Sequence, residues 1–180
     1  MSIIAQSCAM GSLLVIFYVI ITNKRLHMAE DKLFLAFLGN NAIELILDIV
    51  TVRFIRDNPN SMASNIICRF YLLTLIMAGI LLYLYTESAI YAQTNVYGYE
   101  YVKKNSTRSK IYAGVVLSSA VLMLILAPGN AFSNYNGRTI YGPAPMFTYL
   151  YMFVLMASTW SLLIRFRAVI TKKFRNIIIN

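Results

Sequence analysis

The chain has 180 residues, of which 59% are hydrophobic and 13% are charged, and its mean hydropathy is +0.64. Soluble domains carry about a quarter of their residues as charged side chains, so this composition excludes a water-soluble domain. The 13% aromatic content and the two cysteines also exclude a disordered chain and a disulfide-stabilised one. We therefore expect an integral membrane protein.

The apolar residues gather in five runs that approach or reach the length of a membrane span. These runs cover residues 3–22, 33–52, 70–92, 111–127 and 147–164. A helix needs about 20 residues to cross the hydrocarbon layer, and unpaired backbone groups are not tolerated in lipid, so each run is predicted to be helical. The expected fold is an all-α integral membrane domain, a bundle of five transmembrane helices with a short extracytoplasmic β-hairpin.

The net charge of +9 comes from lysines and arginines in short clusters beside these runs, which indicates a topology signal rather than a nucleic-acid surface. The connections after the first, third and fifth runs hold 12 of the 16 basic residues, and the other connections hold 4. Because cytoplasmic loops are rich in Lys and Arg, we expect a multi-pass protein of the plasma membrane (the inner membrane of a bacterium), with its N-terminus outside and its C-terminus in the cytoplasm. The first run is interpreted as a span rather than a signal peptide, because Lys24 and Arg25 follow it and no basic residue precedes it.

The connection before the last run has the pattern of a β-hairpin over residues 133–141. Pro128 and Gly129 are predicted to end the fourth helix, and Asn136-Gly137 is the favoured pair for a type I′ turn, in which both central residues have positive φ. Residues 142–145 (GPAP) would end the hairpin before the fifth helix. We expect this hairpin to lie over the outer end of the bundle as a lid.

Ionisable side chains are costly inside a membrane span and therefore mark candidate sites. In the second run, Asn41, Glu44 and Asp48 share a helix face, and both carboxylates fall in the outer half of the span. Four arginines are expected on the same outer side: Arg53, Arg56, Arg69 and Arg138. Two interpretations stay open. These groups line a water-filled pocket under the hairpin that binds a polar ligand or a cation, or the carboxylates pair with arginines or helix dipoles and only hold the bundle together.

Glu87 lies toward the cytoplasmic end of the third run, where Tyr83 and Tyr91 share its face. We expect an interfacial glutamate whose carboxylate reaches toward the basic third connection. The alternative is that Glu87 is part of a switch that couples the bundle to the cytoplasm.

The remaining candidate groups have mainly structural interpretations. Cys8 and Cys68 are expected near the outer side as two buried thiols, with a disulfide as the alternative. The single His27 has no cysteine or carboxylate cluster at ligand spacing, so no metal site is expected. Small residues at 113–114 and 118–120 give the fourth helix a face suited to close helix packing or to a homodimer.

Several of these features together resemble a known family. They are the apolar run at residues 33–38 (LFLAFL) after a basic inner loop, the hairpin that ends in Gly142-Pro143, and the aromatic last span that continues into a basic tail, residues 165–180. This pattern is similar to the N-terminal membrane region of signalling proteins from Firmicutes, in which several helices precede a cytoplasmic diguanylate cyclase domain of the GGDEF type or a kinase domain. The resemblance covers nearly the whole chain. It implies that the chain is a fragment, followed by further spans and an output domain.

We therefore expect a membrane-embedded sensory domain that detects an extracytoplasmic or membrane signal and passes it to a cytoplasmic output module. The ligand-binding candidates are Asn41, Glu44, Asp48, Arg69, Arg138 and Tyr141, and the coupling candidates are Glu87, Arg165 and Arg167. The expected partners are the lipid bilayer, an unidentified small ligand and a second copy of the chain. Because the sequence contains none of the common catalytic or phosphate-binding patterns, we expect neither an enzyme nor a cofactor, and no nucleic-acid partner. The alternatives are a small transport or channel component and a non-catalytic membrane interaction protein.

Overall fold

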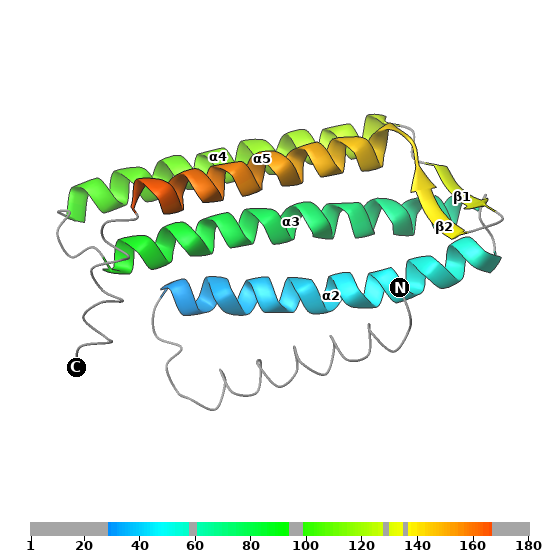
Figure 1. Ribbon diagram of the computed structural model, residues 1–180, viewed down its shortest axis with the longest axis horizontal. Helices are drawn as coiled ribbons and strands as arrows, with labels where there is room; N and C mark the ends of the chain where they lie inside the picture. The colour runs from blue at the N-terminus through cyan, green and yellow to red at the C-terminus, as the bar shows by residue number, and fades with distance from the viewer. Residues whose placement is uncertain (1–28, 58–60, 94–98, 128–129, 135–136, 167–180) are drawn as a thin grey trace, which may run out of the picture.

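The computed structural model describes residues 29–57, 61–93, 99–127, 130–134 and 137–166. The first expected span, residues 3–22, and most of the basic tail lie outside the described residues, as do Cys8 and His27. The described elements are four helices and two strands, which are shown in Figure 1. They are α2 (Ala29–Asp57), α3 (Met62–Gln93), α4 (Tyr99–Leu126), β1 (Asn130–Asn134), β2 (Gly137–Tyr141) and α5 (Pro143–Arg165).

Each of the four helices contains a stretch that is long and apolar enough to cross a membrane. These stretches are Lys32–Val52, Met62–Tyr91, Ser106–Leu126 and Pro143–Arg165. Even the shortest has 21 residues, which meets the length that a transmembrane helix needs. By the length and composition of its helices the chain is a multi-pass membrane protein, so the predicted helical membrane bundle is confirmed. The predicted count of five includes a span that falls outside the described part of the chain.

The helix α3 occupies the centre of the bundle (Figure 1). It packs against α2 on one side and against α4 and α5 on the other, and α4 also contacts α5. The hairpin end of the bundle holds the C-terminal ends of α2 and α4 and the N-terminal ends of α3 and α5. The strands β1 and β2 contact α2 there, and α5 follows β2 directly.

The hydrophobic core joins α3, α4 and α5. Its buried members are Leu72, Ile76, Ile80, Ala113, Val116, Ala120, Leu124, Ala127, Ala144 and Leu155. Three of these residues are buried alanines on α4 and α5, namely Ala113, Ala120 and Ala144. Their small side chains let the helix backbones approach closely, as is common in membrane helix packing. The outer helix α2 buries Leu38 and Thr51 and leaves Ile43 and Ile46 more than half exposed.

The helix α3 begins eight residues before the predicted start of the third span at residue 70. Its first turn is capped by Ser61, whose hydroxyl oxygen accepts a hydrogen bond from the backbone N–H of Ser64 at 3.1 Å. The N–H of Asn65 is bonded to the Ser61 carbonyl at 3.2 Å. A serine in this position satisfies an N–H group that the first helical turn would otherwise leave unpaired. Arg69, which was expected in the connection before the span, therefore lies inside the helix.

The helix α4 also begins earlier than predicted, at Tyr99 instead of residue 111. The expected inner loop around Lys103 and Lys110 is therefore helical backbone. Lysine, arginine and glutamate favour the helix, and no proline interrupts the sequence from Tyr99 to Leu126. Hydropathy locates the part of a helix that lies in lipid, whereas the helix itself extends beyond it.

The strands β1 and β2 pair antiparallel over five residue pairs, from Asn130 with Tyr141 to Asn134 with Gly137. The pairing begins three residues before the predicted start at residue 133. Gly137 belongs to the ladder, so the prediction that Asn136-Gly137 forms the two central turn positions is wrong. The residue pairs are symmetric about a point between residues 135 and 136. The Asn-Gly pair predicts a centre between residues 136 and 137, which is one position later.

A glycine and a proline set the entry into α5. Gly142 has a φ of 131°, a backbone conformation that L side chains rarely adopt, and Pro143 follows it as the first helical residue. The predicted start of the fifth span at residue 147 is thus four residues late, since Ala144 and Pro145 are already buried residues of α5.

Candidate functional site

Polar side chains follow one another along the middle of α2. Asn40, Asn41, Glu44 and Asp48 are all half-buried, within the stretch of α2 that is apolar enough to cross a membrane. The side-chain amide of Asn40 donates a hydrogen bond of 2.9 Å to the backbone carbonyl of Thr74 on α3. Interhelical hydrogen bonds of this kind hold membrane helices in register. Asn40 therefore fixes α2 against α3 beside the two carboxylates.

Glu44 and Asp48 stand one helical turn apart on the same face of α2. The Tyr71 phenol on α3 lies within electrostatic range of both carboxylates, which places this pair toward the interface between α2 and α3. Acidic groups inside a span normally face a partner or a water-filled cavity, and they are candidates for function by default. Chemically, two neighbouring carboxylates favour a positively charged or hydrogen-bond-donating ligand.

Thr51 extends this polar face toward the hairpin. It follows Asp48 by three residues, is 3% exposed, and its hydroxyl oxygen has no hydrogen-bond partner among the described residues. Side chains on a helix lean toward its N-terminus, so the Thr51 side chain leans toward Asp48. Burying an unsatisfied hydroxyl costs free energy, so such a group marks a place where a ligand or water can bind.

Arg69 has a different environment from these carboxylates. Its Nε donates a hydrogen bond of 3.0 Å to the side-chain oxygen of Asn65, and its Nη1 donates to the backbone carbonyls of Leu124 and Ile125 at the end of α4. The last carbonyls of a helix have no partner within the helix and carry partial negative charge, so the guanidinium caps α4. The described contacts of Arg69 are thus with α3 and α4, away from α2.

The remaining ligand-binding candidates belong to the hairpin. Arg138 and Tyr141 lie on β2, opposite Ser133 and Asn130 of β1. Their backbone is at the hairpin end of the bundle, the end toward which the polar face of α2 extends. Only their backbone positions are described.

Glu87 is buried, at 6% exposure, and accepts a hydrogen bond from the Ser109 hydroxyl on α4. The prediction of an interfacial glutamate that reaches toward the basic connection is therefore wrong. The physical reason is that α4 begins at Tyr99, so that Ser109 is a helical residue beside α3 and offers a donor inside the bundle. Tyr83, one turn before Glu87, also interacts with Ser109, and its ring lies 5.4 Å from that of Tyr112 on α4 between centroids, at an interplanar angle of 58°.

A second polar contact continues this cluster to α5. The hydroxyl groups of Tyr112 and Ser158 lie 3.2 Å apart and share a hydrogen bond. We call Tyr83, Glu87, Ser109, Tyr112 and Ser158 the inner polar cluster, because it lies toward the end of the bundle opposite the hairpin. It joins α3, α4 and α5 by side chains alone.

The coupling candidates at the end of α5 lie near this cluster. Phe166 is buried at 6% exposure, and its ring meets that of Tyr91 on α3 edge to face, with 6.0 Å between centroids. Arg165 is an exposed residue, and its guanidinium lies 5.8 Å from the Phe166 ring centroid. Arg167 lies outside the described residues.

Three residues of these polar clusters were not predicted from the sequence: Thr51, Tyr71 and Ser109. Thr51 follows Glu44 by seven residues, so its helical spacing could have added it to the polar face. Tyr71 and Ser109 gave no comparable signal, because their roles depend on which helices are neighbours. Cys68 is a free and buried thiol, as expected. Within the described residues, no three His, Cys, Asp or Glu side chains lie close enough together to hold a metal ion.

Comparison of the chain with known protein families, with curated proteins and with solved structures gave no match.

Proposed function

We propose that the chain is a membrane-embedded signal-input domain that detects an extracytoplasmic or membrane signal and passes it to a cytoplasmic output module. The observation that carries this proposal is the placement of two separate polar clusters along α3. One contains Tyr71 beside Glu44 and Asp48, and the other contains Glu87 beside Ser109. The 16 residues from Tyr71 to Glu87 span about 24 Å of helix at 1.5 Å per residue, so α3 connects the two ends of the bundle.

The proposed orientation follows from the distribution of basic residues. The hairpin end is extracytoplasmic, and the opposite end, with the N-terminus of α4 and the C-terminus of α5, is cytoplasmic. In this orientation Glu44 and Asp48 lie in the outer half of the membrane below β2, with Arg138 and Tyr141 above them. Asn41 completes the proposed ligand-binding group, and the ligand is a small polar molecule or a cation.

The proposed transmission uses helix repacking. A ligand shifts a protein between two conformations only when it binds one of them more tightly. Here a ligand between α2 and α3 would change how α3 packs, and the inner polar cluster would pass that change to α5. The contact of Phe166 with Tyr91 then links the change to the basic tail through Arg165 and Arg167.

The test is a distance measurement between two exposed positions at the proposed cytoplasmic end. Spin labels on Arg108→Cys in α4 and Ile164→Cys in α5, with Cys8 and Cys68 replaced by alanine, report the separation of these helices in liposomes. We expect a two-component distance distribution that shifts when pH, cations or lipid composition is varied. The shift should be lost in Glu44→Gln and in Asp48→Asn, and it should persist in the surface control Ser118→Ala.

A single distance that no condition changes would contradict the input-domain proposal. Flux of ions through the same proteoliposomes, dependent on Glu44, would instead favour the transport alternative.

A further inference from the structure

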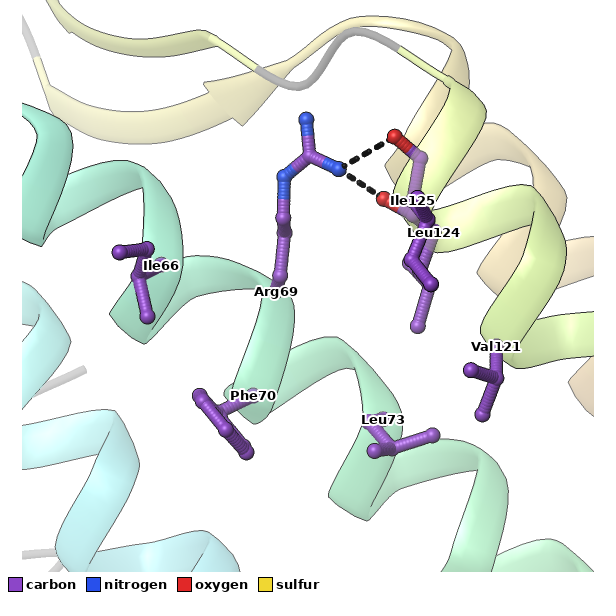
Figure 2. Close-up of a pocket in the computed structure, with 7 residues that line it drawn as sticks. All are labelled: Ile66, Arg69, Phe70, Leu73, Val121, Leu124 and Ile125. Carbon is purple, nitrogen blue, oxygen red and sulfur yellow. Dashed lines mark hydrogen bonds between the residues drawn. The ribbon is translucent and has the colours of Figure 1, made fainter.

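An open apolar groove runs along the surface between α3 and α4 at the hairpin end of the bundle. It has a volume of about 190 Å³ and is lined by Ile66, Arg69, Phe70, Leu73, Val121, Leu124 and Ile125, as Figure 2 shows. The side chains of Ile66 and Phe70 are 43% and 57% exposed, and Ile125 is 66% exposed. Both helices are long and apolar enough to cross a membrane, so the groove lies at membrane depth.

Arg69 is the charged residue among those that line this groove. The Nε and Nη1 groups of Arg69 are engaged by Asn65 and by the last carbonyls of α4, and its Nη2 donates to no described residue. In Figure 2 this second terminal nitrogen points away from the groove, toward the hairpin end. Arg69 lies seven residues after the start of α3, and Leu124 lies two residues before the end of α4. The guanidinium is therefore near the level at which a spanning helix leaves the hydrocarbon.

We propose that this groove binds one phospholipid, with an acyl chain along its apolar walls and the phosphate on the Nη2 group of Arg69. The groove matches an acyl chain because six of its seven lining residues are apolar. The guanidinium matches a phosphate because it presents N–H donors and is always charged. Its capping bonds to α4 hold it in place, so little side-chain entropy is lost when the phosphate binds.

Charge complementarity favours an anionic phospholipid over a neutral lipid. A bulk lipid that merely touches the helix surface would need only apolar contact, and every exposed face of the bundle offers that. The groove at Arg69 adds a cation that is held by hydrogen bonds near the depth of the headgroup. A lipid bound there would also bridge α3 and α4.

Lipid retention by the purified full chain tests the proposal. Native mass spectrometry after delipidation in mild detergent and addition of phosphatidylglycerol should show one tightly bound lipid per chain. Val121→Trp fills the groove while it leaves the bonds of Arg69 in place, and Arg69→Gln removes the charge. Arg69→Gln should weaken binding about tenfold, as expected for the loss of one charge-assisted hydrogen bond. Val121→Trp should weaken binding because the indole occupies the space of the acyl chain. The matched controls are Leu122→Trp, an exposed neighbour outside the groove, and Arg108→Gln at the opposite end, which should bind as the unmodified chain does.

Two further experiments determine what kind of molecule occupies the groove. Diacylglycerol, which has the acyl chains without the phosphate, should bind about tenfold more weakly than phosphatidylglycerol. Equal binding of both lipids, or equal binding by Val121→Trp and Leu122→Trp, would overturn the proposal. A photoreactive amino acid in place of Phe70 should form a lipid adduct, and a crosslink to residues 1–28 or to a second copy would instead identify a protein segment as the occupant.

Discussion

At the scale of single residues, the contribution of the hydrogen bond between Glu87 and Ser109 to stability can be tested by mutation. A buried hydrogen bond to a charged or polar partner contributes about 1–3 kcal/mol when one side is removed, because the other side is left unsatisfied. We expect Ser109→Ala and Glu87→Leu each to lower the free energy of unfolding by about this amount. Thermal or denaturant unfolding of the purified chain in detergent measures both changes.

The double variant separates this bond from general damage. Replacing both partners by apolar residues removes the unsatisfied group as well, so the double variant should be destabilised by about 1 kcal/mol less than the sum of the two single variants. Ser118→Ala is the matched control, because the Ser118 hydroxyl is exposed and bonds to the carbonyl of Gly114 in its own helix. Its effect should stay within about 0.5 kcal/mol. Strict additivity would contradict a direct energetic link between Glu87 and Ser109.

The polar residues of α2 illustrate what a sequence can predict about a site. The spacing of Asn41, Glu44 and Asp48 predicts a shared helix face, which depends only on local geometry. The contacts of Arg69 with α4 could not be predicted, because they depend on the start of α3 at Met62 and on which helix lies beside it. The burial of Glu87 was mispredicted for the same reason. Local spacing is contained in the sequence, whereas the choice of neighbour is a property of the packed bundle.

At the scale of helices, Gly79 controls how closely α3 approaches α5. A Cβ atom added at Gly79 would lie 2.9 Å from the Leu155 Cδ1 atom and 3.0 Å from the Met152 Sδ atom. Leu155 is 1% exposed, so it has little room to move. We expect Gly79→Leu to destabilise the chain by about 1–3 kcal/mol through overpacking. The melting temperature in detergent checks this expectation.

Gly114 provides the matched control for this substitution. It is exposed on α4, and nothing lies within 4 Å of a Cβ atom added there. Gly114→Leu should be neutral or stabilising by up to about 1 kcal/mol, because glycine is a poor helix former. Equal loss of stability in both variants would show that the contact with α5 does not limit the size of the side chain at residue 79. Reduced self-association of Gly114→Leu without loss of stability would support a homodimer through the outward face of α4.

The N-terminal cap of α3 gives a second prediction at this scale. Ser61→Ala removes the oxygen that accepts from the Ser64 N–H and should cost about 1 kcal/mol. Ser61→Asp should retain the cap, because aspartate accepts the same bond and favours the helix N-terminus. Hydrogen exchange of the amides at residues 63–65 should accelerate in the alanine variant only. Unchanged exchange in Ser61→Ala would mean that tertiary packing, rather than the cap, fixes the start of α3.

Helix existence was predictable here and helix ends were not. The apolar runs identified the α2, α3, α4 and α5 spans, because lipid requires long apolar stretches whatever their neighbours are. The helices extend beyond these runs where capping groups and helix-forming polar residues continue them, as at Ser61 and between Tyr99 and residue 111. The hairpin shows the same limit, since the Asn-Gly pair indicated a turn one residue away from the centre of the observed ladder.

At the scale of the whole molecule, the bundle has two chemically different ends. The hairpin end carries the strands, the cap of α3 and the arginine-capped end of α4. The opposite end carries the inner polar cluster, the contact of Tyr91 with Phe166, and six of the ten basic residues in the described helices and strands. A signal-input domain needs this kind of asymmetry, with a ligand-binding end, a transmitting end and a helix that spans both.

The orientation of this asymmetric bundle is the prediction on which the input-domain proposal depends. With 12 basic residues expected on one side and 4 on the other, the positive-inside rule places the hairpin outside the cell. A cysteine at Ser133 in β1 should react with a membrane-impermeant maleimide on intact cells, whereas a cysteine at Arg108 in α4 should react only after permeabilisation. Both variants carry Cys8→Ala and Cys68→Ala, so that the background chain without an added cysteine controls for non-specific labelling. If residue 133 were labelled only after permeabilisation and residue 108 on intact cells, the carboxylates of α2 would lie toward the cytoplasm and could not bind an extracytoplasmic ligand.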